Sequence, residues 1–288
     1  DVYRPAGDTK TDRALILLAH GGSFLPDYGD KSDAYMVDYA MAMAKKGYVV
    51  AAITYREGWA FNPLNTQEQN SRAILPAVWR AIQDYKTATR FFRKSAIADG
   101  NPYGIDERLI IGAGFGAGGY LPMNADILDT PSEITLPELR QKNAFGQVTN
   151  TPYIDTTKAD LGGIFDQSGG SAGYSFRTEL VLNFAGAIAT PKTFITGVNP
   201  LIVSLHSDMD EATPYKTAVV KAAGLFNVIE VHGSYTIANE LWNNYGQKNK
   251  FWSDENRDGL PQAQIADATN GPLNMYQRGL YTFLGKTY

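Results

Sequence analysis

Short apolar runs alternate along this chain with segments in which apolar residues recur at helical spacing. The apolar runs are strand-sized and fall at residues 13–19, 48–55, 108–113, 180–186, 201–206, 227–231 and 250–253. The segments with helical spacing cover residues 33–46 and 66–95, a stretch from Ala117 onward, and residues 214–224, 235–244 and 271–284. This alternation is typical of a mostly parallel sheet with helices on both faces. We therefore predict an α/β fold.

One long segment shows neither period. Residues 121–178 are rich in Gly, Asn, Thr and Pro and are too long for an ordinary connection. We expect this segment to form a lid or cap over the carboxyl ends of the strands. No break in composition divides the 288 residues, so we predict a single domain over residues 1–288 that carries the lid-like insertion.

Composition and charge exclude several classes of partner. The chain has 30 acidic and 26 basic residues, and its longest basic run is Lys45-Lys46, so we expect no nucleic-acid binding. No apolar stretch reaches the roughly 18 to 20 residues that cross a bilayer, so we expect no transmembrane segment. The absence of cysteine excludes disulfides, a thiolate nucleophile and cysteine-based metal sites. The 17 tyrosines and polar loops favour a secreted or cell-surface location.

The strand expected at 108–113 leads into a glycine-rich turn. The sequence from Ile110 to Gly119 has the strand, sharp turn and helix start of a nucleophile elbow, G-x-S-x-G, which holds a serine above the sheet in a strained conformation. Gly116 stands in the serine position and offers no oxygen. The segment 169–173 matches G-x-S-x-G literally, but no apolar strand precedes it, so we interpret it as a loop.

A second glycine turn follows the strand expected at 13–19. It reads His20-Gly21-Gly22-Ser23-Phe24. In lipases and esterases, an HGG turn at this point directs backbone N–H groups at a developing oxyanion. The amides of Gly21, Gly22 and Ala117, which follows the elbow glycine, are therefore the expected oxyanion-hole-like donors.

These segments, in this order, resemble the exported carboxylesterase and lipase branch of the α/β-hydrolases. The resemblance implies an α/β-hydrolase fold with a mostly parallel central sheet. It also places the catalytic acid at Asp210, four residues after His206 at the end of a strand. His206 itself corresponds to a structural position of the family. The likeness covers nearly the whole chain, through Asp1–Asp8, His20–Phe24, Gly47–Val50, Tyr55-Arg56, Ser168–Gly170, Gly173–Ser175, Ala185–Ile188, Pro200–His206, Pro214-Tyr215 and Gly233-Ser234.

The resemblance places the triad histidine in a loop after the last strand. The corresponding residues 252–261 contain no histidine; Gly259 or Leu260 stands where it is expected, and we assign Gly259 as the vestigial histidine position. His232 is the one substitute that keeps the order nucleophile, acid, base, although it lies at the start of a turn well before that loop. Both the serine and the histidine of the triad are thus replaced.

The same stretch contains the beginning of a calcium-binding loop. Asp254, Asn256 and Asp258 offer oxygens at alternate positions before Gly259, in the pattern D-x-N-x-D-G. The twelfth position is Ile265, where a bidentate carboxylate is expected. We interpret this segment either as a structural calcium site or as a solvated acidic turn, and we expect no other cofactor.

Removing the triad serine or histidine of a serine protease lowers kcat on the order of 10⁶-fold. We therefore expect a pseudo-carboxylesterase, a catalytically inactive α/β-hydrolase with a structural, assembly or binding role outside the cytoplasm. Its partner is then a further copy of itself or another cell-surface component. The alternatives are an active carboxylic ester hydrolase with an altered or engineered site, and a carbohydrate- or peptide-binding surface protein.

Overall fold

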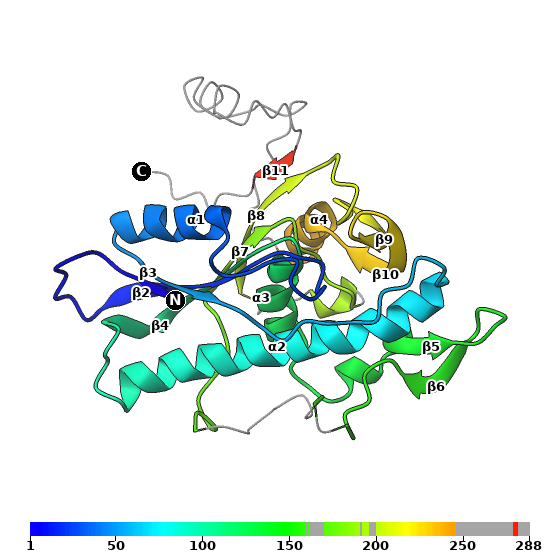
Figure 1. The fold of residues 1–288 in the computed structure, drawn as a ribbon, viewed down its shortest axis with the longest axis horizontal. Coiled ribbons are helices and arrows are strands. Elements are labelled where there is room, and N and C mark those ends of the chain that lie inside the picture. Colours follow the sequence, from blue (N-terminus) through cyan, green and yellow to red (C-terminus); the bar gives the residue numbers. More distant parts are fainter. Residues whose placement is uncertain (159, 162–169, 191, 196–199, 246–278, 282–288) are drawn as a thin grey trace.

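A computed structural model describes residues 1–158, 160–161, 170–190, 192–195, 200–245 and 279–281 of the chain (Figure 1). In this part of the chain, a seven-stranded sheet has the order β1-β3-β2-β4-β7-β8-β11. The inner strands run parallel to one another, and both edge strands are antiparallel to their neighbours. In sheet order these strands are β1 (Val2–Tyr3), β3 (Val49–Ile53), β2 (Arg13–Ala19), β4 (Ile105–Phe115), β7 (Leu180–Phe184), β8 (Leu201–Ser207) and β11 (Gly279–Tyr281).

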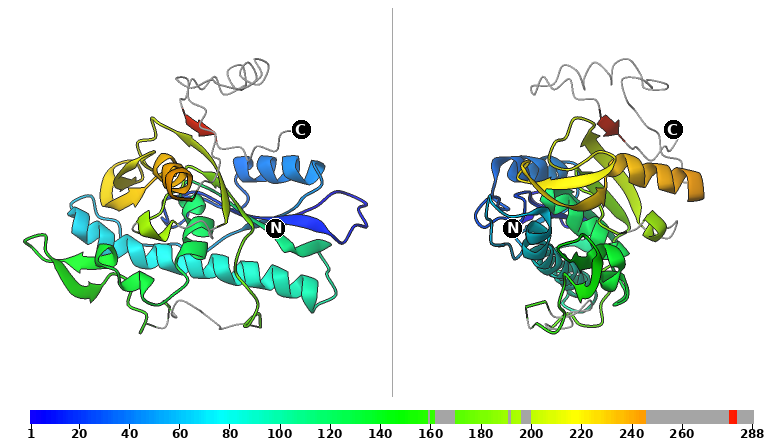
Figure 2. Two further views of the ribbon diagram at one scale, coloured as in Figure 1. Left: turned by 180° about the vertical axis from the view of Figure 1, so that it is seen from behind. Right: turned by 90° about the vertical axis from the view of Figure 1, so that its right-hand side faces the viewer.

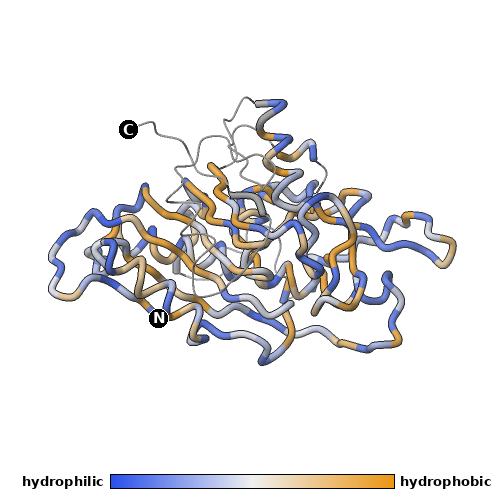
Figure 3. Tube along the Cα trace, turned by 90° about the horizontal axis from the view of Figure 1, so that it is seen from above, coloured by the Kyte–Doolittle hydropathy of each residue, from blue (hydrophilic) through white to orange (hydrophobic). Residues whose placement is uncertain are grey.

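The inner strands are apolar because helices cover both faces of the sheet. On one face, α1 (Ala34–Lys45) packs Met36 against Ile16 and Leu18 of β2. The other face carries α2 (Gln67–Ile97), α3 (Ala117–Ile127) and α4 (Ser234–Tyr245) (Figure 2). Hydrophobic segments accordingly gather inside the trace, and the projecting loops are mostly hydrophilic (Figure 3). The predicted α/β fold with a mostly parallel sheet is confirmed.

Two predicted helices are wrong where the structure describes them. Residues 214–224 contain the strand β9 (Thr217–Ala222), which pairs antiparallel with β10 (Phe226–His232) in a separate two-stranded sheet. Pro214 and the alanines suggested a helix, but β-branched residues of β9 favour pairing with β10. Residues 279–281 of the helix expected at 271–284 form β11. The strand expected at 250–253 lies outside the described residues.

The segment predicted as an insertion begins with helix. Residues 121–127 belong to α3, and the irregular part starts at Leu128. It continues through the short 3-10 turns η1 (Glu133–Thr135) and η2 (Pro137–Leu139) to a hairpin of β5 (Arg140–Lys142) and β6 (Val148–Pro152). A third 3-10 turn, η3 (Lys192–Phe194), follows β7.

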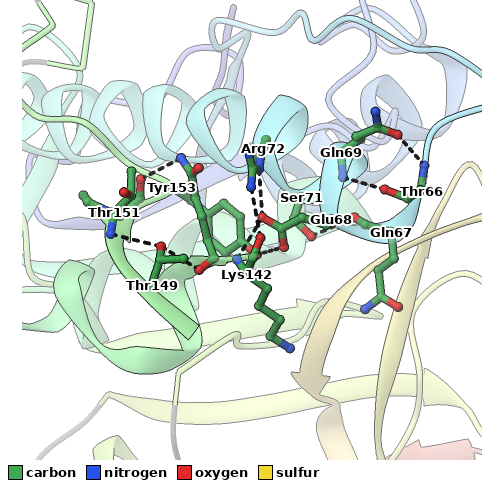
Figure 4. A network of polar contacts seen from close by, with 12 residues as sticks. Thr66, Gln67, Glu68, Gln69, Ser71, Arg72, Lys142, Thr149, Thr151 and Tyr153 are labelled. Atoms are coloured by element: carbon green, nitrogen blue, oxygen red, sulfur yellow. Dashed lines mark hydrogen bonds and ion pairs between the residues drawn. The ribbon is translucent and has the colours of Figure 1, made fainter. Parts of the chain in front are cut away.

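The β5–β6 hairpin is attached to the beginning of α2 by hydrogen bonds to one carboxylate. Glu68 Oε1 accepts the amide N–H of Lys142 at 3.0 Å, and Glu68 Oε2 accepts the hydroxyl of Tyr153 at 2.5 Å (Figure 4). Thr66 caps the same helix end, in a capping box with Gln69. The start of α2 is therefore fixed both by its own cap and by the insertion.

Among the described helices, none combines the length and the apolar character that crossing a bilayer requires.

Candidate active site at the strand-to-helix elbow

Gly116 forms the sharp turn between β4 and α3. Its φ and ψ are +50° and −114°, a conformation that favours glycine, and its amide donates a hydrogen bond to the carbonyl of Phe184 at 2.7 Å. A Cβ placed on Gly116 would meet no other atom within 4 Å. The backbone thus has the strand–turn–helix form of a nucleophile elbow, with room for a side chain that the sequence does not supply.

The other glycines of this turn are needed because strand and helix approach closely. A Cβ on Gly114 would overlap the carbonyl of Gly118, and a Cβ on Gly118 would overlap the carbonyl of Ala19. Side chains at these two positions would push α3 away from β4 and β2. The literal motif around Ser171 has no such setting, because residues 170–173 form turns.

Two of the three expected oxyanion-hole-like amides are free. Within the described part of the chain, the amides of Gly22 and Ala117 donate no hydrogen bond, and both residues line one cavity with Gly116. The amide of Gly21 instead donates to the hydroxyl of Tyr35 at 3.0 Å. A side chain from α1 thus occupies the N–H of Gly21 in the structure, and the role expected for this amide stays a prediction.

The cavity has a volume of about 200 Å³. The elbow and the HGG turn contribute Gly22, Gly116 and Ala117 to its lining, and most of the other described lining residues are apolar. Leu128, Leu139 and Ile154 bring the insertion into these walls. Other lining residues come from α2, α3 and the β9–β10 sheet and include Ile74, Leu75, Val78, Trp79, Ile82, Tyr120, Val220, Ala222, Val228 and Val231.

One polar side chain in the wall of this cavity has no partner. Thr190 is 1% exposed, and its Oγ1 makes no hydrogen bond within the residues that the structure describes. By contrast, Tyr120 and Thr213, which also line the cavity, are joined by a hydrogen bond of 3.3 Å between their hydroxyls. No carboxylate belongs to the described lining residues, so the cavity combines apolar walls with a few hydrogen-bonding groups.

Asp210 lies in the loop after β8, where the resemblance places the catalytic acid. Its Oδ1 accepts the amides of Ala212 and Thr213, each at 2.9 Å, and its Oδ2 lies 3.6 Å from Nε2 of His206. Burial acts to raise the pKa of this carboxyl, but His206 and the two amides outweigh it and hold the pKa below its ordinary value. Ala212 and Thr213 line the cavity, so the loop borders the site.

His206 is held by its surroundings at both ring nitrogens. Nδ1 lies 2.8 Å from Oγ of Ser234, and Nε2 donates to the carbonyl of Thr213 at 3.1 Å. Its side chain is fully buried. This agrees with a structural position at the end of a strand.

The side-chain hydrogen bonds of the other two histidines are made to residues outside the cavity lining. His232 ends β10, and its Nδ1 lies 2.9 Å from Oγ1 of Thr217. His20 stacks on Tyr55 at 4.4 Å between ring centroids, and its Nδ1 donates to the carbonyl of Gly21 at 2.7 Å. Burial lowers the pKa of both imidazoles. No histidine is among the described residues that line the cavity.

Several residues predicted from the sequence lie outside the described residues. These are Gly259, the vestigial histidine position, and the calcium-loop residues Asp254, Asn256 and Asp258. The vestigial histidine position and the calcium site therefore remain predictions from the sequence. Over the ranges that the structure does describe, no group of three or more His, Asp or Glu side chains is arranged to hold a metal ion.

Sequence reasoning missed two residues of the site. Tyr35 lies on α1, where an apolar helical period gives no sign that its hydroxyl reaches Gly21. Thr190 lies after β7, in a stretch without a motif. Neither position carried a signal, because each acquires its role only through the packing of distant segments.

Comparison with models of known protein families gives a match. The model of the family BD-FAE, a family of α/β-hydrolase esterases, matches residues 1–144, which is half of the 288 residues. This chain belongs to the BD-FAE family. The matched half includes the HGG turn, α1, α2 and the elbow, and the α/β-hydrolase fold is thereby established. No curated protein matches the chain significantly.

Solved structures with a distant similarity to this BD-FAE chain include two bacterial proteins. Thermogutta terrifontis esterase 2, phosphorylated by paraoxon, is 20% identical, with a TM-score of 0.46 over 74% of this chain and 66% of its own. The bifunctional GH43-CE protein of Bacteroides eggerthii is 18% identical, with a TM-score of 0.47 over 74% of this chain and 26% of its own. The chain thus spans about two thirds of the first protein and about a quarter of the second.

Proposed function

We propose that this member of the BD-FAE family is catalytically inactive and uses its cavity to bind a ligand that it does not hydrolyse. The observation that carries the proposal is Gly116. The elbow backbone, its close glycine contacts and two free amides are retained, but the position that supplies the nucleophile has no side chain.

The histidines support the same proposal. An esterase of this kind needs an imidazole that reaches the nucleophile and is oriented by an acid. None of His20, His206 and His232 belongs to the described residues that line the cavity, and the carboxylate of Asp210 lies beside His206. Because both the nucleophile and an imidazole that reaches it are missing, we expect ester turnover to be negligible.

The rival is an active ester hydrolase that uses another hydroxyl in the same cavity. Ser23, Thr190 and Thr213 are the candidates, because they are the serine and threonine residues of its described lining. A fluorophosphonate, which phosphonylates activated hydroxyl groups, separates the two functions by intact-mass measurement. We expect the wild-type mass to remain unchanged, whereas a single added phosphonyl group on one of these three residues would establish the rival.

A structural or assembly role is the other form of this proposal, and it makes a different prediction. An assembly subunit self-associates without a ligand, so light scattering of the purified chain at high concentration distinguishes it from a binding protein. A location outside the cytoplasm and calcium binding at residues 254–258 belong to the same proposal. In the remaining variant of the proposal, the cavity binds carbohydrates or peptides.

A further inference from the structure

The cavity beside Gly116 has the features of a site for a small ligand with two polar groups. Its volume of about 200 Å³ exceeds the roughly 150 Å³ of an engineered apolar cavity that binds benzene. A ligand that fills a space of this size contacts all of its walls. The inference below rests on the proposed function, because a ligand that stays bound must not be turned over.

The elbow end of the cavity is suited to negative charge. The free amides of Gly22 and Ala117 lie there, and Ala117 is the first residue of the eleven-residue helix α3, whose N-terminus carries a partial positive charge. No carboxylate belongs to the described lining, and Lys221 is the one described lining residue with a cationic side chain. A carboxylate could therefore accept hydrogen bonds at this end without facing a like charge in the wall.

The second polar feature is independent of the helix. Thr190 has a hydroxyl that is buried and without a partner within the described residues. A buried hydroxyl without a hydrogen bond destabilises the folded protein, and native structures rarely contain one without a reason. A ligand with a hydrogen-bonding group in its body or at its far end would satisfy this hydroxyl, whereas a plain hydrocarbon chain would not.

We propose that the cavity binds a small hydroxy-carboxylic acid, with its carboxylate at the amides of Gly22 and Ala117 and its second oxygen hydrogen-bonded to Thr190. The apolar walls from α2 and the insertion enclose the carbon chain that joins the carboxylate to the second oxygen. Such a site would distinguish two acids with the same carbon chain by the presence of one hydroxyl group.

Titration calorimetry at pH 7 with 6-hydroxyhexanoate and hexanoate tests the role of Thr190. We expect the wild type to bind 6-hydroxyhexanoate about three- to tenfold more tightly than hexanoate, since one net hydrogen bond contributes about that factor. In Thr190→Val this preference disappears, whereas the surface variant Thr9→Val retains it. Equal affinities of the wild type for the two acids, or an unchanged preference in Thr190→Val, would overturn the assignment.

The ligand-free stability of Thr190→Val keeps the test informative if the variant folds differently. Replacing a buried, unpartnered hydroxyl by a methyl group should leave the melting temperature unchanged or raise it. In Thr213→Val the melting temperature should fall, because the hydroxyl of Tyr120 then loses its partner. A lowered melting temperature of Thr190→Val would show that the protein itself uses this hydroxyl and would contradict the proposal.

The place of the carboxylate is tested at the elbow. A side chain at Gly116 has space, so Gly116→Asp and Gly116→Asn carry the same backbone strain and differ in charge. We expect hexanoate to bind at least tenfold more weakly to Gly116→Asp than to Gly116→Asn, because like charges would meet at the same amides. Equal affinities of the two variants would place the carboxylate elsewhere and overturn this part.

These measurements use free acids, so their outcome is separate from that of the proposed function. A chain that hydrolyses esters yet binds hydroxy acids through Thr190 would refute inactivity and leave the site standing. A chain that is inactive and binds neither 6-hydroxyhexanoate nor hexanoate would leave inactivity standing and overturn the site.

Discussion

The hydroxyl of Tyr35 accepts a hydrogen bond from the amide of Gly21 at 3.0 Å, and its ring packs edge-on against Phe115 at 5.1 Å between centroids. One side chain from α1 thereby joins the HGG turn to the residue that precedes Gly116. It also removes Gly21 from the amides that could meet a ligand. The polar end of the cavity consists of Gly22 and Ala117 for this reason.

This relationship predicts the effect of Tyr35→Phe. The variant keeps the ring contact but leaves the Gly21 amide without its partner, so the free energy of unfolding should fall by about 0.5 to 1.5 kcal/mol. Urea unfolding measures the change, and Tyr28→Phe, at an exposed tyrosine in the loop before α1, serves as a control. Equal stability of Tyr35→Phe and wild type would show that the bond contributes nothing in solution.

The glycines of the elbow should differ sharply in their tolerance of alanine. Gly116→Ala places a methyl group in open space, so only backbone strain of about 1 to 3 kcal/mol destabilises it. Gly118→Ala drives a methyl group into the carbonyl of Ala19 and should destabilise the fold far more, or prevent folding. Thermal unfolding of both variants checks the order. A Gly118→Ala protein as stable as Gly116→Ala would contradict the close approach of α3 to β2.

The pH dependence of stability should carry the signature of one buried amine. Lys86 is 1% exposed, and its Nζ lies 4.4 Å from the ring centroid of Phe176. The pKa of this amine is lowered from 10.5 to about 7, chiefly by burial and next by the charge of Arg90. Between these two values the unfolded chain holds a proton that the folded chain lacks. Stability therefore rises with pH from about 7 to 10.5, by up to about 1.4 kcal/mol per pH unit.

Substitution of this amine isolates its contribution. In Lys86→Met the rise in stability between pH 7 and 10 should be smaller than in the wild type, whereas Lys10→Met, at an exposed position, should keep it. Urea unfolding at several pH values measures the three slopes. Parallel curves for wild type and Lys86→Met would mean that the amine is charged in the folded protein throughout this range.

Much of the fold could be predicted because its elements carry local signals. The buried strand β2 is one continuous apolar run, and the elbow is marked by glycines that the packing of α3 requires. The segment around Val219 was misread because its alanines and lysines suit a helix, while its pairing with β10 depends on a strand nearby that period alone does not reveal. β-propensity depends on such partners more than helix propensity does.

The candidate site was predictable only where it coincides with backbone turns. Gly22, Gly116 and Ala117 follow strands and were identified from their motifs. The side chains that give the cavity its walls and its second polar group come from segments without periodicity, such as Leu139, and from isolated positions such as Thr190. Their meeting is a consequence of tertiary packing, which a single sequence does not display.

The rate of nitrophenolate release from nitrophenyl butyrate tests most directly whether this esterase-like fold is inactive as an ester hydrolase. The rate for the wild type is compared with that of buffer alone and of His232→Ala. We expect all three rates to be equal, because Gly116 supplies no oxygen and no histidine lines the described cavity. Release well above the buffer rate that His232→Ala abolishes would show a working catalytic site and contradict the account.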